Sequence, residues 1–183
     1  WIRTDLPLPS RTRADLSVAL EVKNSSDKPS KVVVNGTITP GDVKFTKEVD
    51  INPGATSEVK FDKRYYPQLV INSPKLWWPN GYGEPYLYDA AFTFKTDGKL
   101  SDSLSYKTGI RQMTFNEDKG ILNMYINGRR FVGRGGNWGF SESNLNYRGR
   151  EYDAAVAYND EMNMNILLNW VGMIGDEELY EAC

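Results

Sequence analysis

Two asparagine–tryptophan pairs are the residues of this chain best suited to binding a ligand. Asn137-Trp138 and Asn169-Trp170 each follow a short run with apolar residues, and glycines lie close to both pairs. An asparagine amide can donate hydrogen bonds to hydroxyl groups and accept them, and an indole offers a flat apolar face with one donor. This combination suits a sugar. The spacing favours a second interpretation equally, in which the tryptophans pack in a core or loop and the asparagines satisfy turn backbone.

The composition excludes several kinds of site. The 183 residues include no histidine and a single cysteine, Cys183, so a histidine-based triad, a histidine and cysteine metal cluster and an internal disulfide are all excluded. A net charge of −2 without a basic stripe gives no indication of nucleic-acid binding. No apolar run approaches the roughly 20 residues that cross a bilayer. We therefore expect no metal, no cofactor, no nucleic acid and no membrane as partners.

The carboxylates do not form a catalytic pair in the sequence. Asp153, Asp160 and Glu161 fall on or beside a predicted helix, where we expect them to be solvated. Glu142 lies in a predicted loop near a strand end, and contact with a ligand is the minor expectation for it. The glycines at 133, 135 and 136 lack the spacing and the Lys-Ser/Thr of a phosphate-binding loop. No residue is therefore predicted to be catalytic.

The first half of the chain has the pattern of short strands. Between Ala14 and Ile110, apolar residues repeatedly alternate with polar ones, and turn residues such as Asn52-Pro53-Gly54 separate the runs. The seven runs centre on residues 16–22, 32–38, 43–51, 59–61, 70–71, 86–94 and 104–106. Such a series predicts a β-sandwich domain over 14–110. The proline-containing segment 1–13 is predicted to be a linker from a preceding domain.

The pattern changes near residue 110. Asn127-Gly128 favours the positive backbone angles of a type I′ turn, which predicts a hairpin of Leu122–Ile126 with Arg130–Arg134. The later elements are predicted as a helix over Glu151–Met162, a buried parallel strand over Met164–Asn169 and a second helix capped by Asp176. Strands that alternate with helices are typical of a parallel α/β domain, which we place at 111–183.

Two segments carry a family resemblance. The first is Gly109-Ile110-Arg111, then Tyr125-Ile126-Asn127-Gly128-Arg129-Arg130-Phe131, then Arg134-Gly135-Gly136-Asn137-Trp138. The second is Pro74-Lys75-Leu76-Trp77-Trp78-Pro79, which precedes Leu87-Tyr88. Both are similar to glycoside hydrolase family 2, which includes β-galactosidases, β-glucuronidases, β-mannosidases and exo-β-glucosaminidases. The runs at 135–138 and 169–172 look closer to the β-mannosidase and exo-β-glucosaminidase branch than to β-galactosidases.

The resemblance implies a particular architecture. In that family the first segment links an immunoglobulin-like β-sandwich to a (β/α)₈ catalytic barrel. We therefore expect a mainly β chain, with the sandwich at 14–110 and the first two βα units of the barrel at 111–183. A complete barrel needs about 250 residues. The chain then resembles an internal fragment whose partner is the remainder of the parent polypeptide, and the unclosed segment is expected to pack on its own sandwich or on a second copy, as a homo-oligomer.

The resemblance also implies a function for the parent: hydrolysis of β-linked oligosaccharides in carbohydrate breakdown, exo-acting and with retention, as in β-mannosidases. The catalytic carboxylates of the family come from later strands, beyond Cys183, so the fragment alone is expected to be inactive. A barrel site forms where strands end, so Asn137, Trp138, Asn169 and Trp170 are predicted to bind substrate. The family usually has an arginine where this chain has Leu168, which cannot donate a fork of hydrogen bonds.

The Trp77-Trp78 pair leaves a second function open. It could be a sugar-stacking platform of a non-catalytic carbohydrate-binding or adhesion sandwich, or an aromatic plug under a loop rich in glycine and proline. Exposure of both rings on a flat face favours the binding module, and burial against the hairpin favours the hydrolase. The sequence does not fix the compartment, for which a periplasmic or secreted bacterial location is the first expectation.

Overall fold

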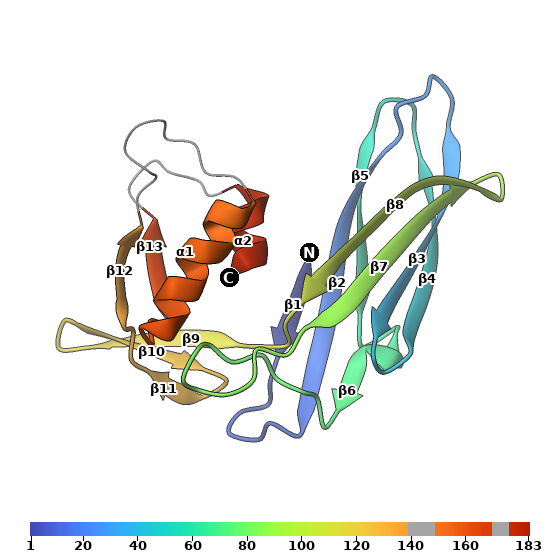
Figure 1. The fold of residues 1–183 in the computed structure, drawn as a ribbon. Helices are drawn as coiled ribbons and strands as arrows, with labels where there is room; N and C mark the ends of the chain where they lie inside the picture. Colours follow the sequence, from blue (N-terminus) through green and yellow to red (C-terminus); the bar gives the residue numbers. More distant parts are fainter. Residues whose placement is uncertain (139–148, 170–175) are drawn as a thin grey trace.

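The computed structural model describes residues 1–138, 149–169 and 176–183 of a mainly β chain. Two antiparallel sheets face each other and form a sandwich (Figure 1). The first sheet consists of β1 (Ile2–Asp5), β2 (Arg13–Lys23), β5 (Thr56–Asp62) and β6 (Val70–Asn72), with the short helix η1 (Pro67–Leu69) before β6. The second sheet has the order β4 (Val43–Ile51), β3 (Ser30–Thr39), β7 (Tyr88–Thr96) and β8 (Lys99–Thr108). All seven strands predicted for the first half of the chain are present.

The alternating residues of both sheets meet in one core. Phe61 and Phe45 lie at its centre with ring centroids 4.7 Å apart, and Phe92 is fully buried beside them. Gly36 faces Phe45 across the β3–β4 pair, and a Cβ atom at residue 36 would lie only 2.2 Å from the Phe45 ring. The absence of a side chain at Gly36 therefore makes room for this ring.

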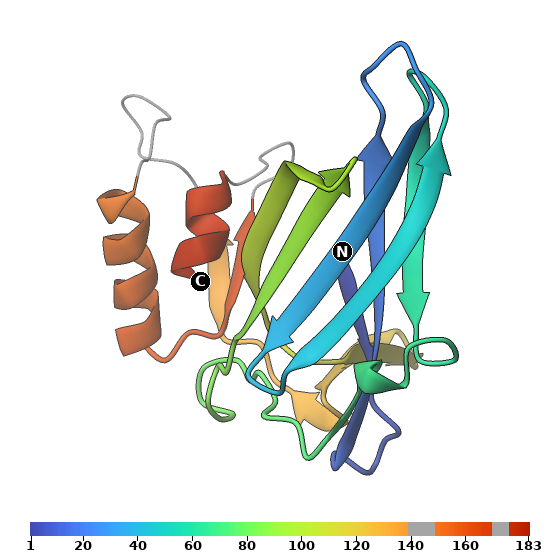
Figure 2. The ribbon, with the colours of Figure 1, turned by 90° about the vertical axis from the view of Figure 1, so that its right-hand side faces the viewer.

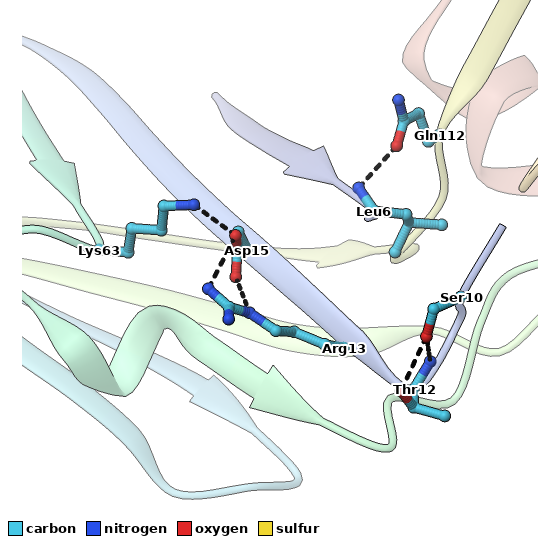
Figure 3. A network of polar contacts seen from close by, with 7 residues as sticks. All are labelled: Leu6, Ser10, Thr12, Arg13, Asp15, Lys63 and Gln112. Atoms are coloured by element: carbon cyan, nitrogen blue, oxygen red, sulfur yellow. Dashed lines mark hydrogen bonds and ion pairs between the residues drawn. The ribbon is translucent and has the colours of Figure 1, made fainter. Parts of the chain in front are cut away.

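The amino-terminal segment differs from the prediction. Instead of a free linker, Ile2–Asp5 forms β1, which pairs with β2, and Leu6 enters the core. The Leu6 amide donates to Oε1 of Gln112 at 2.6 Å, which ties the segment to the chain after the sandwich (Figure 3). Pro7 and Pro9 suggested a linker. The strand before them has only four residues, too few to show a clear alternation of apolar and polar residues.

A small antiparallel sheet follows, and we call it the hairpin sheet. It consists of β9 (Met113–Asp118), β10 (Ile121–Ile126) and β11 (Arg129–Phe131). Asn127 and Gly128 both have positive φ, at 50° and 74°, so the predicted type I′ turn is present. The second strand of that hairpin ends at Phe131 and not at Arg134, and β9 was not predicted because its sequence is largely polar.

The last part of the described chain is an α/β unit. The strands β12 (Gly135–Trp138) and β13 (Ile166–Asn169) pair in parallel, and the helices α1 (Arg150–Glu161) and α2 (Glu177–Ala182) lie against one face of the pair. Both helices were predicted, although Met162 and Tyr180, expected on their apolar faces, are exposed. Among the described residues, no helix has the length and apolar composition to cross a membrane. The α/β unit lies beside the sandwich and above the hairpin sheet (Figures 1 and 2).

Candidate functional site

The two parallel strands are held in register by close contacts at their start. The Asn165 amide donates to the Arg134 carbonyl, and the Arg134 amide donates to Oδ1 of Asn165, both at 2.8 Å. Gly135 lies opposite Ile166, and a Cβ atom at residue 135 would lie 1.8 Å from the Ile166 carbonyl oxygen. Glycine is therefore required for this pairing. No sequence signal indicated the role of Asn165 beyond its place before an apolar run.

The three predicted site residues that the structure describes, Asn137, Trp138 and Asn169, do not lie on one surface. The prediction placed Gly135–Trp138 in the loop after a strand, but these residues are themselves the strand β12. Trp138 is 9% exposed and packs with Tyr152 and Leu179 of the helices, which is the packing role that the sequence had left open. Asn169 is paired with Trp138 and shares its face. Trp170, like Glu142, lies outside the described residues.

Asn137 lies on the opposite face of the strand pair, which we call the open face. Directly across from it in the register is Leu168, and Gly135 and Ile166 complete this face. Asn137 and Leu168 are exposed. Among the described residues, the Asn137 side-chain amide has no hydrogen-bond partner, so it is available to a hydroxyl-bearing ligand. The two residues that sequence reasoning singled out separately, Asn137 as a ligand and Leu168 as a departure from the family, are thus neighbours.

The helix-covered face has a structural role. Tyr152 is fully buried, and its hydroxyl donates to Oδ2 of Asp176 at 2.8 Å, which fixes the start of α2 to α1. Asp176 is the residue before α2, as predicted, but its side chain makes no capping hydrogen bond. Tyr152 and Leu179 enclose Trp138. These contacts set the position of β12 and leave Asn137 on the other side.

Charged groups are absent from the described part of the open face. Asp153, Asp160 and Glu161 are all exposed on α1, as the sequence predicted. The described residues contain no cluster of three acidic, histidine or cysteine side chains that could hold a metal ion. In the described part of the chain, the open face therefore offers a hydrogen-bonding amide beside an apolar wall, which can position a sugar but cannot exchange protons with it.

The tryptophan pair of the sandwich is part of a junction between the sheets. Trp77 and Trp78 are half-buried. The Arg111 guanidinium lies 4.4 Å from the centre of the Trp77 ring, and that of Arg11 lies 5.6 Å from Trp78. A Cβ atom at Gly109 would lie 2.7 Å from Trp77. The pair packs against the chain that leaves the sandwich, as the aromatic-plug interpretation requires.

The junction is completed by Asn127, a fully buried polar residue. Its Oδ1 accepts from the Gln112 amide at 2.8 Å, and its Nδ2 donates to the Trp77 carbonyl at 3.0 Å. Its backbone carbonyl accepts from Nε of Arg11 at 2.7 Å. One residue thus joins the amino-terminal segment, the loop that carries Trp77 and the turn of the hairpin sheet.

The same loop also contacts α1 and the segment between α1 and β13. Nδ2 of Asn80 donates to the carbonyls of Asp160 and Met164, both at 3.1 Å. The hydroxyl of Tyr82 accepts from the Val132 amide at 2.8 Å. The loop 77–82 therefore contacts the α/β unit on the side that faces the sandwich.

Comparisons with known proteins agree with this architecture. Residues 1–111 match the family described as "Glycosyl hydrolases family 2". This match covers more than half of the 183 residues, and the chain belongs to this family of glycoside hydrolases. The resemblance predicted from residues 74–88 and 109–138 is confirmed.

Curated relatives cover most of the chain. The "Mannosylglycoprotein endo-beta-mannosidase" of Lilium longiflorum is 31% identical over 183 residues, with 93% of this chain and 19% of the relative aligned. The "Exo-beta-D-glucosaminidase" of Streptomyces avermitilis is 33% identical over 137 residues, with 74% of this chain and 15% of the relative aligned. The chain therefore spans about a fifth or less of the length of these relatives.

Solved structures share the fold over the whole chain. The exo-chitosanase CsxA of Amycolatopsis orientalis superposes with a TM-score of 0.86 at 22% identity, over 100% of this chain and 20% of that chain. A β-D-mannosidase from Dictyoglomus thermophilum gives a TM-score of 0.76 at 23% identity, over 100% of this chain and 22% of that chain. At such identities the likeness describes the fold alone.

Proposed function

We propose that this chain is part of a longer β-glycoside hydrolase, in which the sandwich precedes a (β/α)₈ catalytic barrel that opens with β12, α1 and β13. The parallel pairing of β12 with β13 across α1 is the observation that carries the proposal. A parallel pair with a helical crossover is the repeating unit of such a barrel. Membership of the family supports a glycosidase as the parent. The boundary at 110/111 is part of this proposal, and the sandwich includes β1.

The parent's substrates are β-linked oligosaccharides, and β-mannosides or related glycosides are the first choice. The names of the lily and Streptomyces relatives support this class. These names include an endo-acting and an exo-acting enzyme, and the proposal is exo action with retention of configuration. Retention requires two carboxylates about 5 Å apart. We assign both to strands that follow Cys183, so the 183-residue chain alone has no turnover.

Asn137 is the substrate-binding residue that we propose within this chain. It lies near the carboxyl end of β12, on the side away from the helices, where a barrel presents its site. Leu168 beside it makes the adjacent wall apolar. We propose that the site at this point holds an uncharged part of the sugar, since no fork of donors is available.

The experiment compares the 183-residue chain with the longer gene product. Both are assayed on aryl β-mannoside, β-glucosaminide and β-galactoside, and on an oligosaccharide with an internal β-mannoside, and proton NMR follows the anomeric product. We expect turnover only by the longer protein, with the β-anomer released first. Turnover by the 183-residue chain, or the α-anomer as the first product, would contradict the proposal.

Matched variants of the longer protein test the assignment of Asn137. Asn137→Ala should lower kcat/KM by about 10- to 100-fold, because one to two hydrogen bonds to the substrate are lost. Asn169→Ala is the control, because Asn169 lies at the same strand end on the helix-covered face. Equal losses in the two variants would show that the open face does not define the site.

The alternative of a carbohydrate-binding or adhesion module has less support. The Trp77-Trp78 pair suggested this alternative, but both rings pack within the junction beside Arg111 and Arg11. Quenching of the fluorescence of these two tryptophans by oligosaccharides would support the binding module.

A further inference from the structure

The hairpin sheet has one apolar and one polar face. Cross-strand partners share a face, so the register places Met113, Phe115, Leu122, Met124, Ile126 and Phe131 together. The opposite face carries Thr114, Asn116, Asp118, Asn123 and Arg130, with Ile121 and Tyr125. An antiparallel sheet with this alternation normally buries its apolar face. We call this face the apolar floor.

Only part of the apolar floor is covered in the described structure. Ile126 and Phe131 are buried. On the same face, Phe115 is 76% exposed, and Met113 and Leu122 are each 62% exposed. Large side chains gathered on one exposed face mark a contact surface, whereas single exposed apolar residues need no explanation.

The apolar floor is continuous with the open face of β12 and β13. The position of a Cβ atom on Gly133 lies 3.3 Å from Cγ2 of Ile166 and 3.7 Å from Cε1 of Phe131. Phe131 of the floor and Ile166 of the open face therefore both lie beside Gly133. Above Ile166, Leu168 extends the apolar wall. In Figures 1 and 2 the hairpin sheet lies below the two parallel strands.

The charges near the floor do not favour a polar occupant. Arg129 shares the floor's face, but its guanidinium lies 4.9 Å from the centre of the Tyr82 ring and donates to the Tyr82 carbonyl. Glu117 lies at the distal end of the floor, opposite Leu122. The centre of the floor, around Met124 and Phe115, is apolar, so it fits apolar side chains.

We propose that the apolar floor closes the amino-terminal end of the barrel interior, and that the amino-terminal ends of later barrel strands of the same polypeptide cover it. This inference rests on the proposed function. Among the described residues, β12 and β13 pair only with each other, so both outer edges remain available for further strands. The chain covers only a fifth of the structures that it superposes on throughout its length, which leaves ample chain to supply them.

Hydroxyl-radical labelling, read by mass spectrometry, tests the proposal on the 183-residue chain and on the longer gene product. Phe115 is compared with Tyr65, which is 77% exposed on the sandwich, and Met113 with Met162, which is 59% exposed. We expect labelling of Phe115 and Met113 to be about fivefold slower in the longer protein, because strands cover them, and labelling of Tyr65 to be unchanged.

Three results would overturn the proposal. One is equal labelling of Phe115 in both proteins. Another is protection of Phe115 in the 183-residue chain that increases with concentration, because a second copy would then be the occupant. The third is a reading frame that stops after Cys183. The labelling does not depend on turnover. A longer protein that hydrolyses glycosides but leaves Phe115 reactive would therefore contradict the proposed cover of the apolar floor and leave the proposed function intact.

A charged variant gives an independent measurement. Phe115→Asp should leave the unfolding midpoint of the 183-residue chain unchanged, because the side chain is exposed there, and should lower the midpoint of the longer protein. Tyr65→Asp is the control and should lower neither. A longer protein that tolerates Phe115→Asp as well as Tyr65→Asp would contradict the proposal.

Discussion

The sandwich and the α/β unit are stabilised in different ways. The sandwich has one continuous core to which strands of both sheets and the amino-terminal segment contribute. Among the described residues, the α/β unit buries only a small cluster around Trp138, Tyr152 and Leu179, and leaves Leu168 and part of Ile166 exposed. Since burial of apolar surface is the main stabilising term, we expect the sandwich to be the stable part of this chain.

The sandwich, with its large core, thus supports an α/β unit whose own core is small. The α/β unit is contacted from the sandwich side by Asn80 of the loop 77–82, and Asn127 joins the same loop to the hairpin sheet. Hydrogen exchange should therefore show strong protection in β2, β3 and β7, and weak protection in β12 and β13.

Removing the central ring of the sandwich should have the largest effect. Phe61→Ala should lower the free energy of unfolding by about 3–5 kcal/mol, because it leaves a cavity beside Phe45 and Tyr66. Urea unfolding followed by circular dichroism measures this change. Tyr65→Ala, at an exposed neighbouring position, is the control and should have little effect. Similar losses in the two variants would contradict the central role of this core.

The parallel strand pair can be broken without harm to the sandwich. Gly135→Ala should cost about 3 kcal/mol locally, because its Cβ atom would overlap the Ile166 carbonyl. Hydrogen exchange should show loss of protection in β12 and β13 alone. Gly136→Ala is a matched control, since nothing lies within 4 Å of a Cβ atom there. Loss of protection throughout β2 and β3 would show instead that the two regions unfold together.

The junction should respond to loss of the Asn127 side chain. Asn127→Gly keeps the positive φ of the turn but leaves the Gln112 amide and the Trp77 carbonyl without this partner, at a cost of about 2 kcal/mol. We expect faster hydrogen exchange in the hairpin sheet and the α/β unit, with the sandwich core unaffected. Asn116→Gly, on the exposed polar face of the hairpin sheet, is the comparison.

The smallest effect should come from an ion-pair network at the edge of the sandwich. Burial by itself raises the pKa of the Asp15 carboxyl, but hydrogen bonds and charge from Arg13 and Lys63 outweigh it and hold the pKa below its usual range (Figure 3). The network therefore stabilises the fold above the usual pKa of about 4, and this stabilisation is lost as the pH falls through the lowered value.

Asp15→Asn measures this contribution. The variant should be less stable by about 1 kcal/mol at pH 7 and should approach the stability of the original chain in acid. Thermal unfolding from neutral to acidic pH gives the comparison. A stability difference that persists unchanged in acid would show that the carboxylate charge is not its source.

The period-two pattern was sufficient to predict the strands of the sandwich, because each buries one face against a common core. The pattern could not predict β1 or β9, since a four-residue strand and a polar strand carry too few apolar residues to show alternation. The role of Gly36, which makes space for Phe45, depends on a partner strand and is not visible locally.

Prediction of the candidate site was limited by register. The strand was expected before residue 135, but β12 lies four residues later, so Asn137 and Trp138 are strand residues with side chains on opposite faces. The short run 135–138 contains two glycines and no apolar alternation, so its pairing with β13 could not be predicted from the sequence alone. Asn165, which joins the two strands, gave no pattern at all.

The Asn127-Gly128 turn also has a consequence for chemical ageing. When an asparagine precedes glycine, its side chain can cyclise onto the next backbone nitrogen and release ammonia, and hydrolysis then leaves aspartate or isoaspartate. In the folded chain, both ends of the Asn127 amide are held by Gln112 and Trp77 out of contact with solvent, which opposes this reaction. The rate of deamidation at residue 127 therefore reports how often the contacts of Asn127 with Gln112 and Trp77 open, and each conversion would place a negative charge where no solvent can stabilise it.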